Sequence, residues 1–250
     1  MFPPIGATSS LLLCFAHPDD ETIFAAGLMC AASAAGRPVV LVTGTRGEAG
    51  RTGDPPVCEP HELGATRERE LREAAGIVGV TDLRVLGYPD RALAAAPIDE
   101  VRATLVEVIR GHRPSVIVSF DPHGTNQHTD HVAISRFTSD AVAVASDPRW
   151  FPELGDAHVV SRLLWVPRRQ WDMLRSGNPA VKPGVDFLVD VRPWAVRKAA
   201  ALRAHRSQHL STERIFFNYP DQPLTLGFEI FRQAWGPPLR SRPSGDVFED

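Results

Sequence analysis

The sequence predicts an α/β protein: one domain built on a mostly parallel sheet, with helices covering both faces and an elaborated C-terminal part. Two observations predict this class. Short apolar runs typical of strands alternate with helix-like patterns up to Asp147, and polar or glycine-rich loops follow several of these runs. Sheets of this kind bind ligands outside the carboxyl ends of their strands, so we expect a functional site in those loops.

The first elements are strand, helix, strand and helix. Leu11–Phe15 is a short buried strand, and Pro18 suits the first position of the alanine-rich helix after it, because that position needs no N–H donor. Residues 38–43 form a second apolar strand that leads into glycine- and proline-rich turns over 44–64. A charged helix over 66–78 follows.

The alternation continues through the middle of the chain. A strand over 83–86 precedes a helix over 97–110, in which apolar residues recur near helical spacing. Val116–Phe120 is the next apolar strand, and a helix over 132–146 follows it. This repeated order of strand and helix is what predicts the parallel sheet.

Beyond Asp147 the pattern is less regular. We expect strands over 161–166 and 187–191 and a basic helix over 194–206. Residues 1–236 are assigned to one domain, and residues 237–250 are expected to form a poorly ordered tail.

Composition excludes several classes of protein. The net charge of −3 gives no basic excess for nucleic acid, and the longest apolar stretch, 23–35, is too short to span a bilayer. No signal peptide precedes the first strand, so we expect a cytoplasmic protein that binds neither nucleic acid nor a membrane. The three cysteines Cys14, Cys30 and Cys58 are scattered, which argues against disulfides and against a cysteine-based metal site.

A dense polar motif, residues 16–21 with the sequence Ala-His-Pro-Asp-Asp-Glu, follows the first strand. His17 and Asp20 are three residues apart and can converge on one point if the chain turns helical there, whereas Asp19 points elsewhere but stays close. Zinc accepts imidazole nitrogen and carboxylate oxygen together. The acids alone could equally be helix caps, because the helix dipole favours negative charge in the first turn.

A second polar cluster follows the strand Val116–Phe120. His123, His128 and His131 fall within nine positions of one loop, which also carries Asp121 and Asp130. A structural histidine would explain one of these residues but not the group. Because both clusters follow strand carboxyl ends, they can meet at one rim of the sheet, and the sequence therefore predicts a metal site there.

Common alternatives for this fold class lack support. The glycine-rich loop over 44–50 has no Gly-Lys-Ser/Thr for a phosphate-binding loop and lacks the spacing of a dinucleotide fingerprint. No Gly-x-Ser-x-Gly elbow occurs, which removes the usual serine hydrolase.

The chain resembles the PIG-L/LmbE-like family of zinc-dependent N-acetylglucosaminyl deacetylases, which includes the mycothiol and bacillithiol biosynthetic deacetylases. The resemblance covers most of residues 10–210 in the family's order. Its motifs are 16–21, Thr43-Gly44 with Arg46-Gly47-Glu48, the helix start 67–71, Gly87-Tyr88-Pro89-Asp90, Arg113-Pro114, His128-Thr129-Asp130-His131, and Lys198 with 205–208.

The resemblance implies a Rossmann-like fold and a set of roles. Zinc would be held by His17, Asp20 and His131, with Asp19 as general base and His128 assisting the oxyanion or the leaving amine. Positions resembling Arg67 and Asp90 contact the sugar-linked polyol in the mycothiol branch. The candidate substrate-binding residues are Arg46, Glu48, Arg67, Asp90 and Asn126.

Two positions depart from the family pattern. Thr129 replaces the proline of the usual His-Pro-Asp-His, which loosens the turn without touching a ligand. Asn126 stands where the mycothiol branch commonly has a tyrosine, which removes an aromatic hydroxyl near the oxyanion.

General principles of zinc catalysis, without reference to the family, are consistent with the same roles. Three protein ligands leave the fourth zinc position for water, the arrangement of catalytic rather than structural zinc. Asp19 would take a proton from that water, and zinc and His128 would serve the oxyanion and the nitrogen. Asp130 could orient a ligand imidazole from the second coordination shell or cap the following helix.

We therefore expect a zinc-dependent hydrolase that removes the acyl group from an N-acetylglucosamine-type sugar in a small glycoconjugate. An amidase of the same fold that cleaves a larger acyl group, as from a thiol conjugate, is one alternative. A non-catalytic metal- or sugar-binding protein is the other, which Asp19 argues against, since mere binding needs no unliganded carboxylate. Loops 44–64 and 141–154 are expected to select the aglycone, and the sequence is compatible with a homo-oligomer as well as a monomer.

Overall fold

The structure is a computed structural model that describes residues 3–6, 9–168, 170–175, 184–218 and 220–249. Its described strands form one sheet in the order β3-β2-β1-β4-β5-β7-β6. The strands are β1 (Leu11–Phe15), β2 (Val39–Thr45), β3 (Asp82–Tyr88), β4 (Val116–Phe120), β5 (Arg162–Val166), β6 (Phe187–Asp190) and β7 (Phe228–Trp235). Strands β1 to β5 pair in parallel, and β7 runs antiparallel to both β5 and β6. The α/β prediction is confirmed, except that β7 was not expected.

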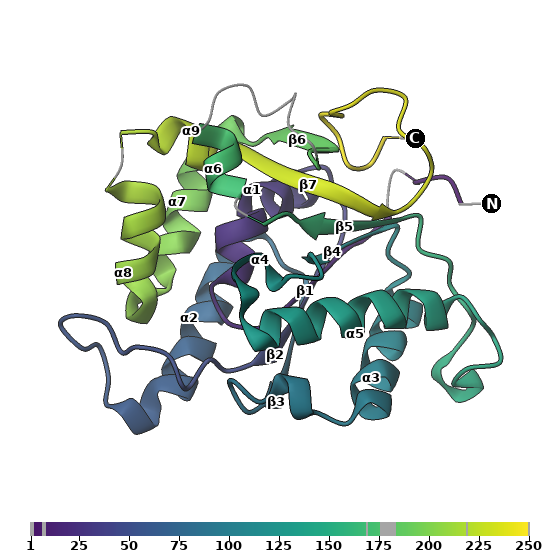
Figure 1. Cartoon of the computed structure of the whole chain (residues 1–250), viewed down its shortest axis with the longest axis horizontal. Coiled ribbons are helices and arrows are strands. Elements are labelled where there is room, and N and C mark those ends of the chain that lie inside the picture. Colours follow the sequence, from purple (N-terminus) through teal and green to yellow (C-terminus); the bar gives the residue numbers. More distant parts are fainter. Residues whose placement is uncertain (1–2, 7–8, 169, 176–183, 219, 250) are drawn as a thin grey trace.

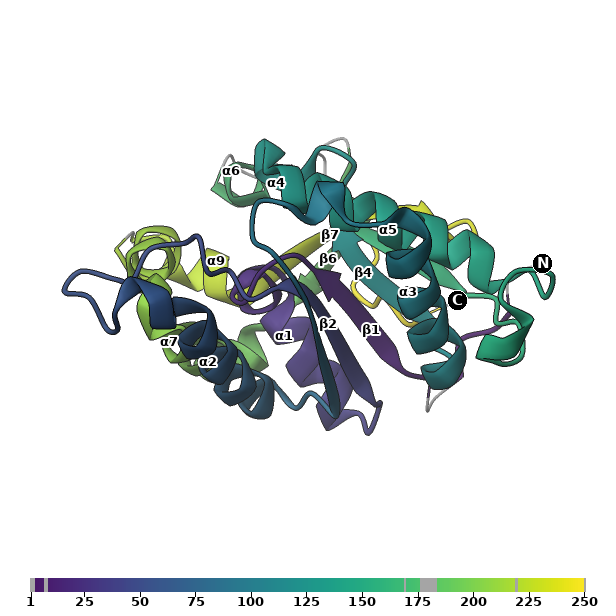
Figure 2. The same ribbon diagram turned by 90° about the horizontal axis from the view of Figure 1, so that it is seen from below.

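Helices cover both faces of the sheet (Figures 1 and 2). One face carries α1 (Asp20–Ala34), α2 (Leu63–Val78) and α7 (Ala195–Ala204), and the other carries α3 (Ile98–His112) and α5 (Thr129–Ala145). The shorter helices are α4 (Gly124–Gln127), α6 (Gln170–Arg175), α8 (His209–Thr212) and α9 (Gln222–Gly227).

The apolar sequences of the central strands explain why these strands are buried. Every residue of β1 and β4 is buried, as continuous apolar runs should be in a parallel sheet covered on both faces. Leu11 of β1 pairs with Val39 of β2 and with Val116 of β4, so β1 lies between them. The loops that follow β1 and β4 therefore leave the same edge of the sheet side by side.

Helix α1 is kinked at Ala25, where φ is −147°. Beyond the kink, the backbone amides of Gly27 and Leu28 donate to the two carboxylate oxygens of Glu229 in β7, at 2.8 and 2.9 Å. Lys198 of α7 neutralises this carboxylate at 2.9 Å, and both side chains are almost fully buried. The ion pair between Lys198 and Glu229 therefore helps to hold α1 in place, and the first residues of α1 belong to the site described below.

The tail differs from its prediction. The sequence indicates poor order from residue 237, whereas the structure packs 237–249 beside β5 and β6 (Figure 1). Val247 is buried, and its carbonyl accepts a hydrogen bond from the fully buried Arg162 at 2.5 Å. Ser244 also pairs with Phe187 of β6. Long-range pairing of this kind leaves no local pattern in the tail itself.

Within the described residues, no helix combines the length and apolar character needed to cross a membrane. The cytoplasmic location expected from the sequence stays a prediction.

Candidate active site

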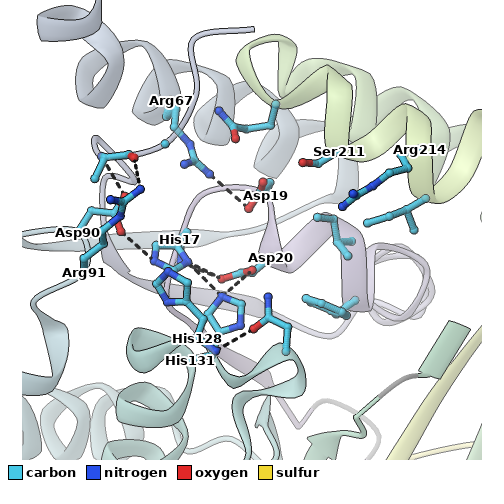
Figure 3. Close-up of a pocket in the computed structure, with 17 residues that line it drawn as sticks. His17, Asp19, Asp20, Arg67, Asp90, Arg91, His128, His131, Ser211 and Arg214 are labelled. Carbon is cyan, nitrogen blue, oxygen red and sulfur yellow. Dashed lines mark hydrogen bonds and ion pairs between the residues drawn. The ribbon is translucent and has the colours of Figure 1, made fainter.

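A pocket of about 280 Å³ opens at the carboxyl edge of the parallel strands (Figure 3). The loop after β1 brings His17 and Asp19 to the pocket, and the first turn of α5, which follows β4, brings His131 there, as the sequence predicts. The far wall comes from a segment of the C-terminal part that includes Ser211 and Arg214.

The turn between β1 and α1 places Asp19. Helix α1 begins at Asp20, so Pro18 lies before the helix and not at its first position as predicted. Asp19 adopts a left-handed backbone with φ of 112°, which a residue with a Cβ rarely does. Its carbonyl accepts from the amide of Ile23 at 2.9 Å and so starts the helix. In this conformation the side chains of Asp19 and Asp20 diverge (Figure 3).

Three donors converge as a metal site requires. Nδ1 of His17 lies 3.1 Å from Nε2 of His131, and the carboxylate oxygens of Asp20 lie 3.5 and 3.4 Å from these two nitrogens. Ligands at zinc–nitrogen distances of about 2.0–2.1 Å in a tetrahedron stand about 3.3 Å apart. Two imidazole nitrogens and a carboxylate are also a donor set of catalytic zinc, so the residues fit the metal.

Hydrogen bonds orient both imidazoles of this set. Nε2 of His17 lies 3.2 Å from Oδ1 of Asp90 and 3.3 Å from Oδ2 of Asp130, and Nδ1 of His131 lies 3.2 Å from the carbonyl of Gly124. These acceptors favour a proton on the facing nitrogen, which leaves the opposite nitrogen with its lone pair toward the metal position.

In His128 the Nδ1 atom accepts a hydrogen bond, whereas in His131 the Nδ1 atom faces an acceptor. Nδ1 of His128 accepts from the amide of Asp130 at 3.2 Å and so caps α5, which puts the ring proton of a neutral imidazole on Nε2. Burial, together with the nearby His17, lowers the pKa of His128 and favours the neutral ring. A nitrogen of His128 nonetheless lies within 4.8 Å of nitrogens of His17 and His131, so proximity alone would admit it as a third ligand.

Two roles were predicted for Asp130, orienting a ligand imidazole and capping the following helix, and its position fits the first. Its carboxylate accepts from the backbone amides of Arg91 at 2.6 Å and Leu93 at 3.2 Å and faces His17, while His128 takes the capping position. His17, Asp90 and Asp130 also lie close enough to form a donor group of their own. Both acids face Nε2 of His17, whereas His131 and Asp20 face Nδ1, and this geometry favours the two acids as hydrogen-bond partners of the ring over a second metal set.

The surroundings of Asp19 and Asp20 shift the pKa values of the two carboxyl groups in opposite directions. Burial raises the pKa of Asp19 to about 6, against the opposing charge of Arg67, whose Nη2 lies 3.3 Å from Asp19 Oδ1. Burial also acts on Asp20, but His131 and His17 outweigh it and lower its pKa to about 2. Carboxyl groups separated in this way can divide ligand and acid–base roles.

Comparison with known proteins identifies the family. A model of the PIG-L family, described as GlcNAc-PI de-N-acetylase, matches residues 12–142, which contain both histidine motifs. The chain belongs to the PIG-L family. It is 34% identical over 287 aligned positions to a protein of Streptomyces avermitilis named 1D-myo-inositol 2-acetamido-2-deoxy-alpha-D-glucopyranoside deacetylase, with 96% of each chain covered. The resemblance inferred from the sequence motifs is confirmed.

Solved structures share the fold. The conserved protein TT1542 from Thermus thermophilus is 26% identical with a TM-score of 0.69, covering 92% of this chain and 97% of its own. The N,N'-diacetylchitobiose deacetylase from Pyrococcus horikoshii has a TM-score of 0.70 at 24% identity, covering 90% and 84% of the two chains, and shows the shared fold.

The candidate substrate-binding residues of this PIG-L protein divide into two groups. Arg67, Asp90 and Asn126 line the pocket, whereas Arg46 and Glu48 do not. Nε of Arg46 donates to Glu68 at 2.7 Å, and Glu48 accepts from the amide of Asp90 at 2.9 Å, so both brace the neighbouring loops. The Asp90 carboxylate also accepts from the amide of Ala49.

The pocket also contains residues that sequence reasoning missed. Ser211, Arg214 and Ile215 line it from α8 and the π-helical turn Glu213–Phe217. Such short irregular turns have no apolar periodicity, and the one available signal was the family-like segment 205–208 beside them.

The loop 141–154 was wrongly expected at the pocket, and none of its residues lines it. His131 lies in the first turn of α5, and residues 141–145 form the end of the same helix, so the segment starts about 15 Å along the helix from His131, at 1.5 Å per residue. Arg110 of α3 holds the loop there through the carbonyls of Trp150 and Phe151, at 2.8 and 2.6 Å.

Proposed function

We propose that this protein is a zinc-dependent N-deacetylase of an N-acetylglucosamine-type sugar in a small glycoconjugate. One observation carries the proposal: a three-donor set of His17, Asp20 and His131 stands beside Asp19, a buried carboxyl group that the set does not use. The printed names of PIG-L relatives indicate the first substrate to test, N-acetylglucosamine linked to myo-inositol.

The reaction needs a nucleophile, a base and stabilisation of the oxyanion. When bound, zinc lowers the pKa of water from about 15.7 to roughly 7 and polarises the amide carbonyl. Asp19 is the base that accepts the proton of the attacking water, and Arg67 holds its carboxylate from one side at 3.3 Å. The elevated pKa of Asp19 makes its carboxylate a stronger base than an ordinary aspartate.

His128 supplies a hydrogen-bond donor. Because Nδ1 is engaged by the amide of Asp130, the Nε2–H of the neutral ring is available to donate to the developing oxyanion. The C–N bond breaks as Asp19 passes the proton that it took from water to the leaving nitrogen, and the products are acetate and the free amine. Asp130 and Asp90 act through His17 by fixing its tautomer.

Substrate contacts are proposed for the residues that line the pocket. Arg67 lies beside Asp19, and Arg214 stands on another wall of the pocket (Figure 3). Asn126 also lines the pocket. Within the described part of the chain, Arg214 has no hydrogen-bond or ion-pair partner. Its donors are therefore free for an aglycone.

The test is a deacetylation assay with N-acetylglucosaminyl-inositol that detects the free amine. We expect amine release that a chelator abolishes and added zinc restores, with acetate formed in equal amount. No turnover of any N-acetylglucosamine conjugate by the zinc-loaded protein would contradict the proposal.

The same assay separates the alternatives. Release of a larger acid from a thiol conjugate, without acetate release, would favour the amidase. Tight sugar binding with no hydrolysis would favour the non-catalytic alternative. The proposed partner is a small molecule, and the oligomeric state stays a prediction to be measured by sedimentation.

A further inference from the structure

Glu21 and His205 form a buried pair that the proposed chemistry does not use. Nε2 of His205 lies 2.8 Å from Oε1 of Glu21, and both side chains have no exposed surface. Burying a charged or polar pair costs free energy, because each group loses its hydration, so a fully buried pair calls for an explanation. Neither residue lines the pocket.

The second oxygen of Glu21 reaches the catalytic turn. Oε2 accepts from the backbone amide of Asp19 at 3.0 Å, and Asp19 is the residue with the left-handed φ of 112°. Such a conformation persists in a residue with a Cβ only when its surroundings over-determine it. The bond to Glu21 is one constraint, and the amides of Thr22 and Ile23, which donate to the Asp19 carbonyl, are another.

His205 is itself anchored to the framework. Two residues on, Ser207 donates its amide and its hydroxyl to Glu70 of α2, at 2.9 and 2.6 Å. Helix α2 also carries Arg67, which contacts the Asp19 carboxylate. The backbone and the carboxylate of Asp19 are thus both tied to α2, one through Glu21 and His205 and the other through Arg67.

We propose that Glu21 and His205 are positioning residues, which hold the strained Asp19 turn so that its carboxylate faces the pocket and diverges from the metal ligand Asp20. The inference rests on the proposed base role of Asp19. It assigns a purpose to the last acid of the 16–21 motif and to His205, which are 184 residues apart.

The first test replaces the bond between Glu21 and Asp19. Glu21→Ala removes the acceptor, whereas Glu21→Gln keeps an amide oxygen for the backbone N–H of Asp19. Its NH2 group then donates to Nε2 of a neutral His205, whose ring proton moves to Nδ1. We expect Glu21→Ala to lower kcat by about 10- to 100-fold, the loss typical of a catalytic group displaced by about 1 Å, with KM and zinc content unchanged. Glu21→Gln should restore most of kcat. Glu73→Ala removes a solvent-facing acid paired with Arg206 next to His205, and it is the matched control.

A double-mutant cycle distinguishes positioning from general support of the fold. If Glu21 acts through Asp19, Glu21→Ala costs nothing further in an Asp19→Ala background, where residual turnover is measured at high enzyme concentration. Equal losses in both backgrounds, or loss of zinc from Glu21→Ala, would overturn the inference. Full kcat in Glu21→Ala, with Asp19→Ala inactive, would overturn it while leaving the proposed function intact. Full turnover of Asp19→Ala would instead refute the base role itself.

Substitutions at His205 decide the same question if Glu21→Ala does not fold. His205→Gln keeps a donor to Glu21 and should retain kcat within about threefold, whereas His205→Leu should lower kcat by roughly tenfold or more at normal zinc content. Equal kcat in the two variants would contradict the inference.

Discussion

Nδ1 of His17 and Nε2 of His131 lie 3.1 Å apart although 114 residues separate them in the chain. The contact follows from the sheet, because β1 and β4 are parallel neighbours in register and each histidine follows the carboxyl end of one of them. The geometry of the proposed metal site is therefore set by strand order, and each half of the site can be predicted from local sequence.

The two histidines of the second motif should respond differently to removal. His131→Ala deletes a metal donor, so we expect the purified variant to lose its zinc and its turnover. His128→Ala deletes the Nε2–H donor and should retain zinc while kcat falls by about 10²- to 10⁴-fold. Metal analysis beside single-substrate kinetics checks both. Equal zinc loss would refute the division of roles drawn from the hydrogen bond between His128 and Asp130.

Asp130 should affect the metal through His17. Asp130→Asn removes the charge that faces His17 and keeps one oxygen, for one of the two amides of Arg91 and Leu93, which donate to different carboxylate oxygens. We expect zinc affinity to fall by about 10- to 100-fold, as is typical when a carboxylate behind a ligand histidine is lost. Competition with a chromophoric chelator measures this. Asp140→Asn alters a solvent-facing acid of the same helix and should leave the affinity as it is.

Turnover should show an acid limb that belongs to Asp19. Burial raises the pKa of Asp19 to about 6, and the base must be ionised, so kcat is present above this pKa and falls as the pH decreases through it. The charge of bound zinc lowers the pKa of a neighbouring carboxyl group, so the midpoint should lie at about pH 6 or below. Arg67→Gln removes a charge that lowers the pKa of Asp19 and should move the midpoint upward. An unchanged midpoint in that variant would contradict the assignment.

Arg214 should contribute to substrate binding and not to the chemical step. It lines another wall of the pocket with free donors. Arg214→Ala should raise KM for the inositol conjugate by roughly 10- to 100-fold, the loss of one hydrogen bond from a charged donor, with kcat unchanged. Arg72→Ala, which removes an exposed arginine bonded to Glu68, is the control. A drop in kcat without a change in KM would place Arg214 in the chemistry instead.

Most of the framework could be predicted because it is encoded locally. The fully buried runs of β1 and β4 and the histidine motifs after them are contiguous in sequence, and parallel pairing brings their ends together. The left-handed turn at Asp19 could not be predicted in this way. It depends on Glu21, whose own position depends on His205 in a distant segment.

The C-terminal part was less predictable for a similar reason. β7 contains the buried Glu229. From sequence alone a glutamate is expected at the surface, and its burial is explained only by the ion pair with Lys198. The tail is held by Arg162, a fully buried arginine that donates to the carbonyls of Val247 and Glu249 in the tail. The pocket wall at Ser211 and Arg214 comes from turns too short for periodicity to reveal.

The most direct test is the Asp19→Asn variant, assayed for bound zinc and for deacetylation of N-acetylglucosaminyl-inositol on the same preparation. The side chain keeps its size and loses its basicity, while His17, Asp20 and His131 are untouched. We predict a full complement of zinc together with a fall in kcat of about 10²- to 10⁴-fold. Full zinc with unchanged turnover would contradict the account.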